Sequence, residues 1–286
     1  MNIDELKFEK LNFNGVKTLA TWAQEEGWNT GPHDAEVYFA TDPDGFYGFH
    51  HNGELIAGGS IVSYNGEFGF MGFFIVKTEY RAHGIGRKLW YHRRDKLRSR
   101  LHKNAAIGMD GVVAMQAFYQ KGGFEIAFRD VRYEKKGTAF TIDKNISPIE
   151  ETDVETILKY DKQCFGFSRP QFLKPWLQLP LTKTFKYIEN GELKGFAIIR
   201  KCNTGYKVCP LFADNLEVAE ALYKACLNAV IGELVYIDIP MINEDAKALI
   251  KKYEATYIFE CARMYLGNPP AINFNKVFGI TTFELG

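Results

Sequence analysis

The feature that most constrains this chain is a strand that runs into a turn, two glycines and a helix. Residues 68–76 are largely apolar, residues 81–86 read RAHGIG, and a basic helical stretch follows. The free amides and the dipole of a helix N-terminus bind anions. Gly84 and Gly86 carry no side chain, so a bulky phosphate can approach the backbone closely. This segment predicts a phosphate-binding loop.

Two familiar nucleotide-binding loops do not fit this segment. A P-loop requires Gly-Lys followed by Ser or Thr, which is absent. A dinucleotide-binding fingerprint requires a third glycine where Leu89 stands, and parallel strands around it. The strands before the loop instead suggest an antiparallel arrangement. Two interpretations stay open at this point, an Arg-x-x-Gly-x-Gly diphosphate loop and an ordinary glycine-rich turn.

An antiparallel meander is predicted from apolar runs that are separated by turn pairs. Strands are expected at 46–50, 55–64 and 68–76, joined by Asn52-Gly53 and Asn65-Gly66. Asn-Gly between apolar runs favours a tight hairpin because both residues tolerate positive φ. The other elements expected in this half are helices at 16–22 and 34–39, a strand at 105–108 and a helix that ends in residues 118–124.

A second motif closes this half, where residues 118–124 read FYQKGGF. Together with the Arg81–Arg87 loop, in the order strand, loop, helix, strand and helix, it resembles the GNAT acetyltransferases, whose domains end on an FYxKxGF segment. The resemblance covers the chain up to about residue 137. Gly27-Trp28-Asn29 and the turn at 42–45 add a likeness to two-domain GNAT proteins of the YitH type. The resemblance implies a mixed α/β (α+β) sheet.

The resemblance also implies acetyl-CoA as the acetyl donor. In the family the donor lies in a V-shaped opening between two parallel strands, here 68–76 and 105–108. Backbone groups of Phe74 and Val76 would contact the pantetheine amides and the acetyl carbonyl. An amide aimed at the thioester oxygen stabilises the charge that develops during attack. The cofactor-binding residues implied are Phe74, Ile75, Val76, Arg81, Ala82, His83, Gly84, Ile85, Gly86 and Arg87.

By the same resemblance Tyr119 is the catalytic candidate, which donates a proton to the departing CoA thiolate. Its alternative is a packing tyrosine on an amphipathic helix. The family's strand glutamate is missing from 68–72, and its asparagine is replaced by Val112. Asp110, Glu67 or a water relay would then deprotonate the amine. Asp110 has a structural alternative as a helix N-cap.

Other residues of the first half are candidates for contacts with the acceptor, a metal ion or nucleic acid. Trp28 and Asn29 lie where GNAT domains build the acceptor pocket, although a buried structural Trp fits equally well. His50 and His51 point to opposite faces of a strand, so no metal site is expected. The basic stretch from Lys77 to Lys103 is expected to be a solvated helix face beyond Arg87, with Arg93 and Arg100 among its exposed cations. Nucleic acid is not an expected partner, because aromatic residues do not alternate with these cations.

The second half repeats the order of elements and lacks the motifs. Strands are expected at 184–189, 194–200 and 206–212, with helices at 216–230 and 243–252. No Gly-x-Gly follows the third strand, and Ile250 occupies the tyrosine position. We therefore expect a degenerate GNAT copy that resembles the second domain of YitH-type proteins. Arg169 and Asp214 are weak candidates for acceptor contacts, with ordinary surface or cap roles favoured.

Composition sets the remaining expectations. The chain has 286 residues, long enough for two domains, predicted at 1–140 and 141–286. Thirty-five basic and 35 acidic residues balance, which disfavours a mainly electrostatic nucleic-acid binder. Five cysteines without a CxxC pair disfavour a disulfide scaffold or a zinc site. With no signal peptide or membrane span evident, a cytoplasmic monomer or homodimer is expected.

The functional prediction is an N-acetyltransferase that works by direct attack of an amine in a ternary complex. The first half has no cysteine, which argues against an acetyl-enzyme there. The acceptor is a small-molecule or peptide amine, with no membrane involved. The alternative is a non-catalytic acyl-CoA sensor with the same fold, suggested by the missing glutamate and asparagine.

Overall fold

The computed structural model describes residues 3–286, which form two compact units. The first unit takes in the chain up to Asp110, together with Tyr265–Pro269 and Phe283–Gly286. The second unit comprises Gly111–Met264 and Pro270–Thr282. Each unit contains a mixed sheet with helices, which confirms the predicted α/β class. Within residues 3–286, no helix is both long and apolar enough to cross a membrane.

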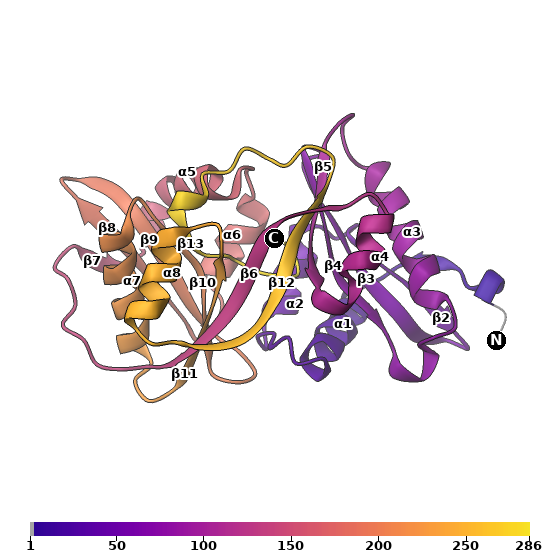
Figure 1. The fold of residues 1–286 in the computed structure, drawn as a ribbon, viewed down its shortest axis with the longest axis horizontal. Helices are drawn as coiled ribbons and strands as arrows, with labels where there is room; N and C mark the ends of the chain where they lie inside the picture. Colours follow the sequence, from indigo (N-terminus) through magenta and orange to yellow (C-terminus); the bar gives the residue numbers. More distant parts are fainter. Residues whose placement is uncertain (1–2) are drawn as a thin grey trace. The chain divides into compact units, whose positions relative to one another are not determined.

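The first unit is built on a meander that ends in one parallel pair (Figure 1). Its strands follow one another in the sheet in chain order, from β1 to β5. All neighbours are antiparallel except β4 and β5, which are parallel. The elements are β1 (Phe8–Lys10), α1 (Phe13–Glu25), α2 (Asp34–Thr41), β2 (Phe46–His51), β3 (Glu54–Tyr64), β4 (Phe68–Val76), α3 (Ile85–Arg98) and β5 (Ala106–Val112).

Both predicted hairpin turns form as expected. Asn52 and Gly53 have φ values of 50° and 81°, and Asn65 and Gly66 have 52° and 75°. These left-handed conformations match the twist of the flanking strands. The turns fix the pairing of β2 with β3 and of β3 with β4 at the hairpin ends.

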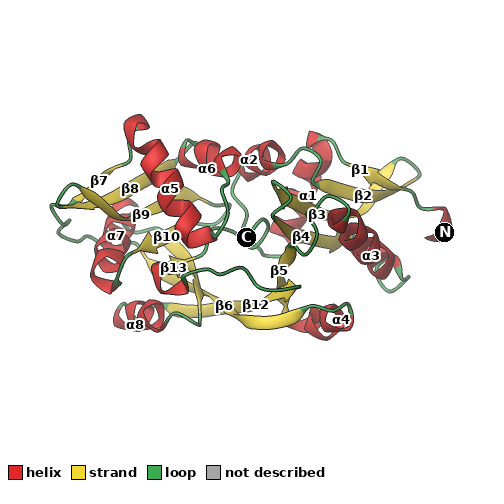
Figure 2. Cartoon of the chain, turned by 90° about the horizontal axis from the view of Figure 1, so that it is seen from above, coloured by secondary structure: helices red, strands yellow, loops and turns green. Residues whose placement is uncertain are grey.

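Helices cover both faces of this sheet, with α1 and α2 on one side and α3 on the other (Figure 2). Adjacent glycines of β3 show the two faces. A Cβ on Gly58 would lie 2.9 Å from Leu19 of α1, and one on Gly59 would lie 2.4 Å from Arg93 of α3. The missing side chains let the helices pack closely on the middle of the sheet.

The second unit repeats this plan. Its sheet follows the order β6, β11, β10, β9, β8 and β7, and β10 and β11 form the parallel pair. Helices α5 and α6 lie on one side, and α7 and α8 on the other (Figure 2). The elements are α4 (Gln116–Lys121), β6 (Glu125–Lys136), β7 (Ile146–Pro148), α5 (Val154–Phe165), α6 (Pro170–Leu177), β8 (Thr182–Glu189), β9 (Glu192–Lys201), β10 (Tyr206–Ala213), α7 (Leu216–Ala229), β11 (Leu234–Pro240), α8 (Glu244–Lys252), β12 (Thr256–Leu266) and β13 (Val277–Gly279).

The face of this sheet opposite the α7 core holds a buried ion pair. Arg132 of β6 donates two hydrogen bonds to Asp238 of β11, at 2.6 and 2.7 Å. Lys207 of β10 lies 3.8 Å from the same carboxylate. Burial raises the pKa of Asp238, but the charges of Arg132 and Lys207 outweigh it, so the net shift is downward. The carboxylate therefore stays ionised inside the sheet.

One predicted boundary was wrong. The strand expected at 105–108 continues to Val112, followed by a single 3-10 turn and the short helix α4. Asp110 consequently lies within β5 and cannot cap a helix, which removes the structural alternative considered for it. The apolar residues around Asp110-Gly111 carry the strand across a pair of residues that usually indicates a turn.

Candidate functional site

The parallel strands β4 and β5 pair over only part of their length. Their register joins Phe68 to Ala106, Gly69 to Ile107 and Phe70 to Gly108. β4 continues to Val76 beyond these pairs, and β5 continues to Val112. The backbone groups of β4 that face β5 over residues 71–76 are therefore not used by the ladder. This is the opening that the sequence predicted between these two strands.

A bulge in β4 lies at the beginning of the opening. The register of β3 and β4 shifts between Gly58 and Ser60, and Phe73 has a φ of 49°. Arg93 of α3 is fully buried and donates to the carbonyls of Ser60 and Gly72. A buried charged donor in place of ladder bonds holds the bulge in shape. The expectation that Arg93 belongs to a solvated helix face was wrong.

The loop after β4 ends on a helix N-terminus that has no side-chain cap. Gly84 is the N-cap residue of α3, with a φ of 80°, and no side chain accepts a hydrogen bond from the first turn. Ala82 also has a positive φ, of 65°. The residues from Arg81 to Gly84 are exposed, and the first turn contains no acidic residue. Such a terminus presents unpaired amides and a positive dipole end to an anion.

The two arginines of this loop differ in their surroundings. Arg81 donates from Nε to the carbonyl of Val76, at 2.8 Å, and its guanidinium pairs with Glu26, the C-cap residue of α1. It thus ties the loop to the end of β4. Arg87 is exposed, with its guanidinium over the ring of Tyr91. A phosphate at this loop would therefore meet backbone amides and Arg87, whereas Arg81 shapes the loop.

Gly86 is a glycine that the described protein itself does not require. A Cβ added there would lie 3.5 Å from the Phe74 ring and from Val76, which is ordinary contact. Neither its φ nor a steric clash inside the protein explains the glycine. The predicted cofactor residues Phe74, Val76 and Gly86 thus lie together, at the open end of β4.

The predicted proton donor Tyr119 belongs to the second unit. It lies in α4, it is 3% exposed, and its ring packs on Gly111, where an added Cβ would lie 3.0 Å from Cδ2. Gln116 of α4 donates to the carbonyl of Gly111 at 3.0 Å, which fixes the helix on the end of β5. Asp110, the residue before Gly111, is half-buried and belongs to the first unit.

Trp28 and Asn29 lie in the connection between α1 and α2. Both are half-buried, and Asn29 has a φ of 57°. The Trp28 amide donates to the carbonyl of Ala23 at 2.9 Å, which folds the connection back on α1. These residues are therefore on the α1–α2 side of the sheet. Their role as acceptor contacts stays a prediction.

Sequence reasoning missed the segment Phe283–Gly286, which packs on the same side of the first unit. Ser60 Oγ donates to the carbonyl of Glu284 at 3.2 Å, and Tyr64 donates to the carbonyl of Leu285 at 2.7 Å. Glu284 is 3% exposed, and its Oε2 lies 3.4 Å from the hydroxyl of Tyr38. Nothing local in the sequence signals this contact, because Ser60 and Glu284 are 224 positions apart in the chain.

The second unit closes the corresponding opening with its own chain. β10 and β11 pair from Tyr206 to Val208, and beyond this β13 pairs with β10, joining Leu211 to Gly279 and Phe212 to Val277. On the other side the Ile280 amide donates to the carbonyl of Asp238 of β11, at 2.8 Å. β13 thus lies between the two strands, at the place that corresponds to the opening between β4 and β5 in the first unit.

Two asparagines complete this closure. Asn243, the N-cap of α8, donates to the carbonyls of Phe274 and Val277 at 3.0 and 2.9 Å and so holds the β13 segment. Asn215 caps α7 by accepting from the Val218 amide at 3.0 Å. The helix that corresponds to α3 therefore has a side chain on its N-terminus. The prediction of a copy without a diphosphate loop is consistent with both features.

The acceptor contacts considered in the second half serve the fold. Arg169 is buried and makes two hydrogen bonds to Asp161, at 2.8 and 2.7 Å. Asp214 accepts from Tyr160 at 2.8 Å and from Lys276 at 2.8 Å. Arg169 is buried rather than on the surface, and it occupies the N-cap position of α6 without a side-chain cap bond.

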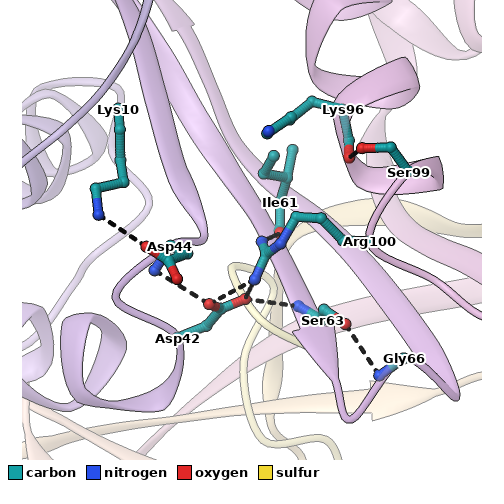
Figure 3. Close-up of polar contacts among 9 residues, drawn as sticks. All are labelled: Lys10, Asp42, Asp44, Ile61, Ser63, Gly66, Lys96, Ser99 and Arg100. Carbon is teal, nitrogen blue, oxygen red and sulfur yellow. Dashed lines mark hydrogen bonds and ion pairs between the residues drawn. The ribbon is translucent and has the colours of Figure 1, made fainter.

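The basic stretch after the loop is also partly committed to the fold. Arg100, just after α3, binds both carboxylate oxygens of Asp42 at 2.7 Å and the carbonyl of Ile61 at 2.8 Å (Figure 3). Asp42 in turn accepts from the Ser63 amide at 2.8 Å. Arg100 therefore ties the turn before β2 to β3, and its assignment to a solvated face was wrong.

Comparisons with known proteins agree with this geometry. A model of the acetyltransferase (GNAT) family matches residues 13–124, and a second acetyltransferase (GNAT) domain model matches residues 157–279. The holothin acyltransferase of Pseudoalteromonas sp. (strain SANK 73390) is 29% identical over 267 residues, which cover 93% of this chain and 89% of the relative.

Solved structures show the same fold along the whole chain. A putative acetyltransferase from Pyrococcus horikoshii superposes with a TM-score of 0.83 and 22% identity, covering 98% of this chain and 96% of that one. A tandem GNAT protein from the clavulanic acid biosynthesis pathway gives a TM-score of 0.66 and 12% identity, covering 93% and 100%. In the first unit a splayed strand pair precedes an uncapped helix with glycine at its N-cap, and in the second unit the corresponding opening is closed. The chain belongs to the GNAT acetyltransferase family and carries two GNAT domains in tandem.

Proposed function

We propose that this protein is an N-acetyltransferase whose first GNAT domain transfers acetyl from acetyl-CoA to an amine. The observation that supports it most strongly is the contrast between the two copies. β4 and α3 leave an open strand edge and an uncapped helix terminus, whereas β13 and Asn215 fill both places in the second copy. Binding of one donor molecule per chain follows from this contrast.

The residues of the first domain fit acetyl-CoA. The amides from Arg81 to Gly86 would bind the diphosphate, with Arg87 as an exposed cation beside them and Gly86 as the point of closest approach. Backbone groups of Phe74 and Val76 would bind the pantetheine arm. An amide at the β4 bulge would stabilise the oxyanion during attack. The bound donor supplies the activated acetyl group as a thioester.

Transfer proceeds by direct attack of the amine on the thioester carbonyl. The first domain holds no cysteine, so no acetyl-enzyme on a thiol forms there. Tyr119 donates a proton to the departing thiolate, an assignment that rests on the FYQKGGF motif. Asp110 remains a candidate for the base, since it lies on β5 and caps no helix.

The acceptor class is proposed as small-molecule or peptide amines, with longer acyl-CoAs as alternative donors. The holothin acyltransferase, similar over most of both chains, makes small-molecule acceptors the first to test. We propose a cytoplasmic monomer or homodimer that needs neither nucleic acid nor a membrane. The rival function is acyl-CoA sensing without transfer, which Val112 at the family's asparagine position favours.

The test is an acetyl-transfer assay of the purified protein over an amine panel, with free CoA as the readout. We expect turnover with at least one amine, and Tyr119→Phe should lower kcat while the Kd for acetyl-CoA stays within about twofold of wild type. Tyr257→Phe, at an exposed tyrosine of the second unit, is the matched control. Donor binding without transfer across the panel would favour the sensor. Unchanged kcat in Tyr119→Phe would remove the proposed role of this residue.

A further inference from the structure

We propose that Glu284 is the general base of this transferase, the carboxylate that takes a proton from the acceptor amine. The inference rests on the proposed function and supplies the group that β4 lacks. In many GNAT relatives a glutamate of this strand takes the proton from the amine, and residues 68–72 contain no glutamate. The structure brings a glutamate to the same strand from the far end of the chain.

Glu284 is placed on the β4 bulge by backbone contacts. Its carbonyl accepts from Ser60 Oγ at 3.2 Å, and the same hydroxyl accepts from the Gly72 amide at 2.9 Å. The next carbonyl, of Leu285, accepts from Tyr64 at 2.7 Å. The segment is thus fixed at two points along β3, directly beside the part of β4 where pairing with β5 ends.

Gly72 makes this approach possible. A Cβ at that position would lie 2.0 Å from the carbonyl oxygen of Glu284 and 2.7 Å from its carbonyl carbon. Both distances are far below van der Waals contact, and the obstacle is backbone, which cannot rotate away. Glycine at this position of β4 therefore has a reason inside the protein, which is to admit the segment that carries Glu284.

The carboxylate of Glu284 faces α2. Oε2 lies 3.4 Å from the hydroxyl of Tyr38, and the Tyr38 ring packs edge-on against Phe73, with centroids 5.5 Å apart. Phe73 is the bulge residue with positive φ. The Tyr38 hydroxyl also donates to Asp34 Oδ2, at 3.2 Å. Glu284 is thus on the α1–α2 side of the sheet, where the Trp28-Asn29 connection also lies.

The other candidate bases are less well placed. Glu67 is exposed in the turn before β4, at the end of the strand that is paired with β5. Asp34 accepts from the Gly31 amide at 2.8 Å and so has a structural task at the start of α2. Asp110 lies on β5 and is the remaining competitor. Of these, Glu284 adjoins the bulge itself.

The proposed step balances in protons and bonds. Glu284 takes one proton from the acceptor ammonium, and the neutral amine attacks the thioester carbonyl carbon. The C–N bond forms, and the C–S bond breaks as the tetrahedral intermediate collapses. The thiolate takes a proton from Tyr119, and the second proton of the nitrogen returns through solvent to the Tyr119 phenolate. Glu284 then releases its proton to water.

The experiment compares Glu284→Gln with Glu36→Gln, the same change at an exposed site of the same domain. We expect Glu284→Gln to lower kcat/KM for the amine about 100-fold or more near neutral pH, the usual scale for a general base. The loss should shrink at high pH, where the amine is already neutral. Glu284→Asp should restore part of the rate. The Kd for acetyl-CoA and the Tm of Glu284→Gln should match those of Glu36→Gln.

Three outcomes would overturn the proposal. The first is wild-type amine kinetics in Glu284→Gln. The second is a loss in Glu284→Gln that is the same at every pH and accompanied by weaker acetyl-CoA binding, which indicates a structural role. The third is a pH-dependent loss in Asp110→Asn and none in Glu284→Gln. If the wild-type protein transfers no acetyl group, the proposed function fails and this inference fails with it.

Discussion

Replacing Gly86 with alanine separates the needs of the protein from those of its ligand. A Cβ at this position meets Phe74 and Val76 at 3.5 Å, so the chain accommodates it without strain. Gly86 lies in the first turn of α3, where alanine is the better helix former. We expect the variant to be as stable as wild type or more stable, by up to about 1 kcal/mol.

The same methyl group stands where the proposed diphosphate lies closest to the backbone. Loss of one hydrogen bond to a charged group costs about 1.5–3 kcal/mol. Since about 1.4 kcal/mol corresponds to tenfold in Kd, acetyl-CoA should bind about ten- to 100-fold more weakly. Stability and ligand affinity are thus predicted to move in opposite directions in one variant.

The assay pairs thermal or chemical unfolding of the free protein with calorimetric titration of acetyl-CoA. Gly27→Ala is the control, because Gly27 has a φ of 79° and open space around it. That variant should lose about 1–2 kcal/mol of stability from backbone strain and keep its Kd. Wild-type affinity in Gly86→Ala, or equal weakening in both variants, would refute the placement of the diphosphate at this helix terminus.

Three further changes test the second unit. Asp238→Asn removes the partner of buried Arg132 and should destabilise the protein by about 3–5 kcal/mol in chemical unfolding. Burial raises the pKa of Glu220, but hydrogen bonds such as that from Lys252 outweigh it and lower the pKa to about 2. The ionised Glu220 carboxylate therefore stabilises the protein fully above its ordinary pKa of 4.5, and this contribution is lost as the pH falls toward 2. The difference in unfolding free energy between wild type and Glu220→Gln should narrow over that range. A difference that does not depend on pH would contradict this. Asn243→Ala should lower the Tm through loss of the cap and of the contacts to β13, and an unchanged Tm would refute that role.

Local signals made much of the first unit predictable. Asn-Gly pairs set both hairpins, and the strand–glycine–helix sequence placed the loop at Arg81–Arg87, because turn chemistry and caps depend on neighbouring residues. The repeat of elements in the second half could be read in the same way. The division at residue 140 stays a prediction, and so do the roles of Tyr119, Trp28 and Asn29.

The features that were missed depend on contacts between distant parts of the chain. Arg93 has the sequence context of a surface helix residue, and only Gly59 across the sheet gives its guanidinium room inside. β13 reads as a short tail segment, and it pairs with β10 beyond Val208, where the ladder between β10 and β11 ends. Glu284 depends on Gly72 in the same manner. A glycine inside a strand was the one sequence signal for these contacts. Such a glycine leaves space for a residue from a distant part of the chain, which no local pattern identifies.

We propose that one of the two GNAT copies keeps an open donor site and that the other closes the corresponding place with its own chain. The number of acetyl-CoA molecules bound per chain, measured by calorimetry on the intact protein, tests this most directly. We expect one molecule per chain, with affinity weakened by Gly86→Ala and unchanged by Asn243→Ala. Two molecules per chain, or none, would contradict it.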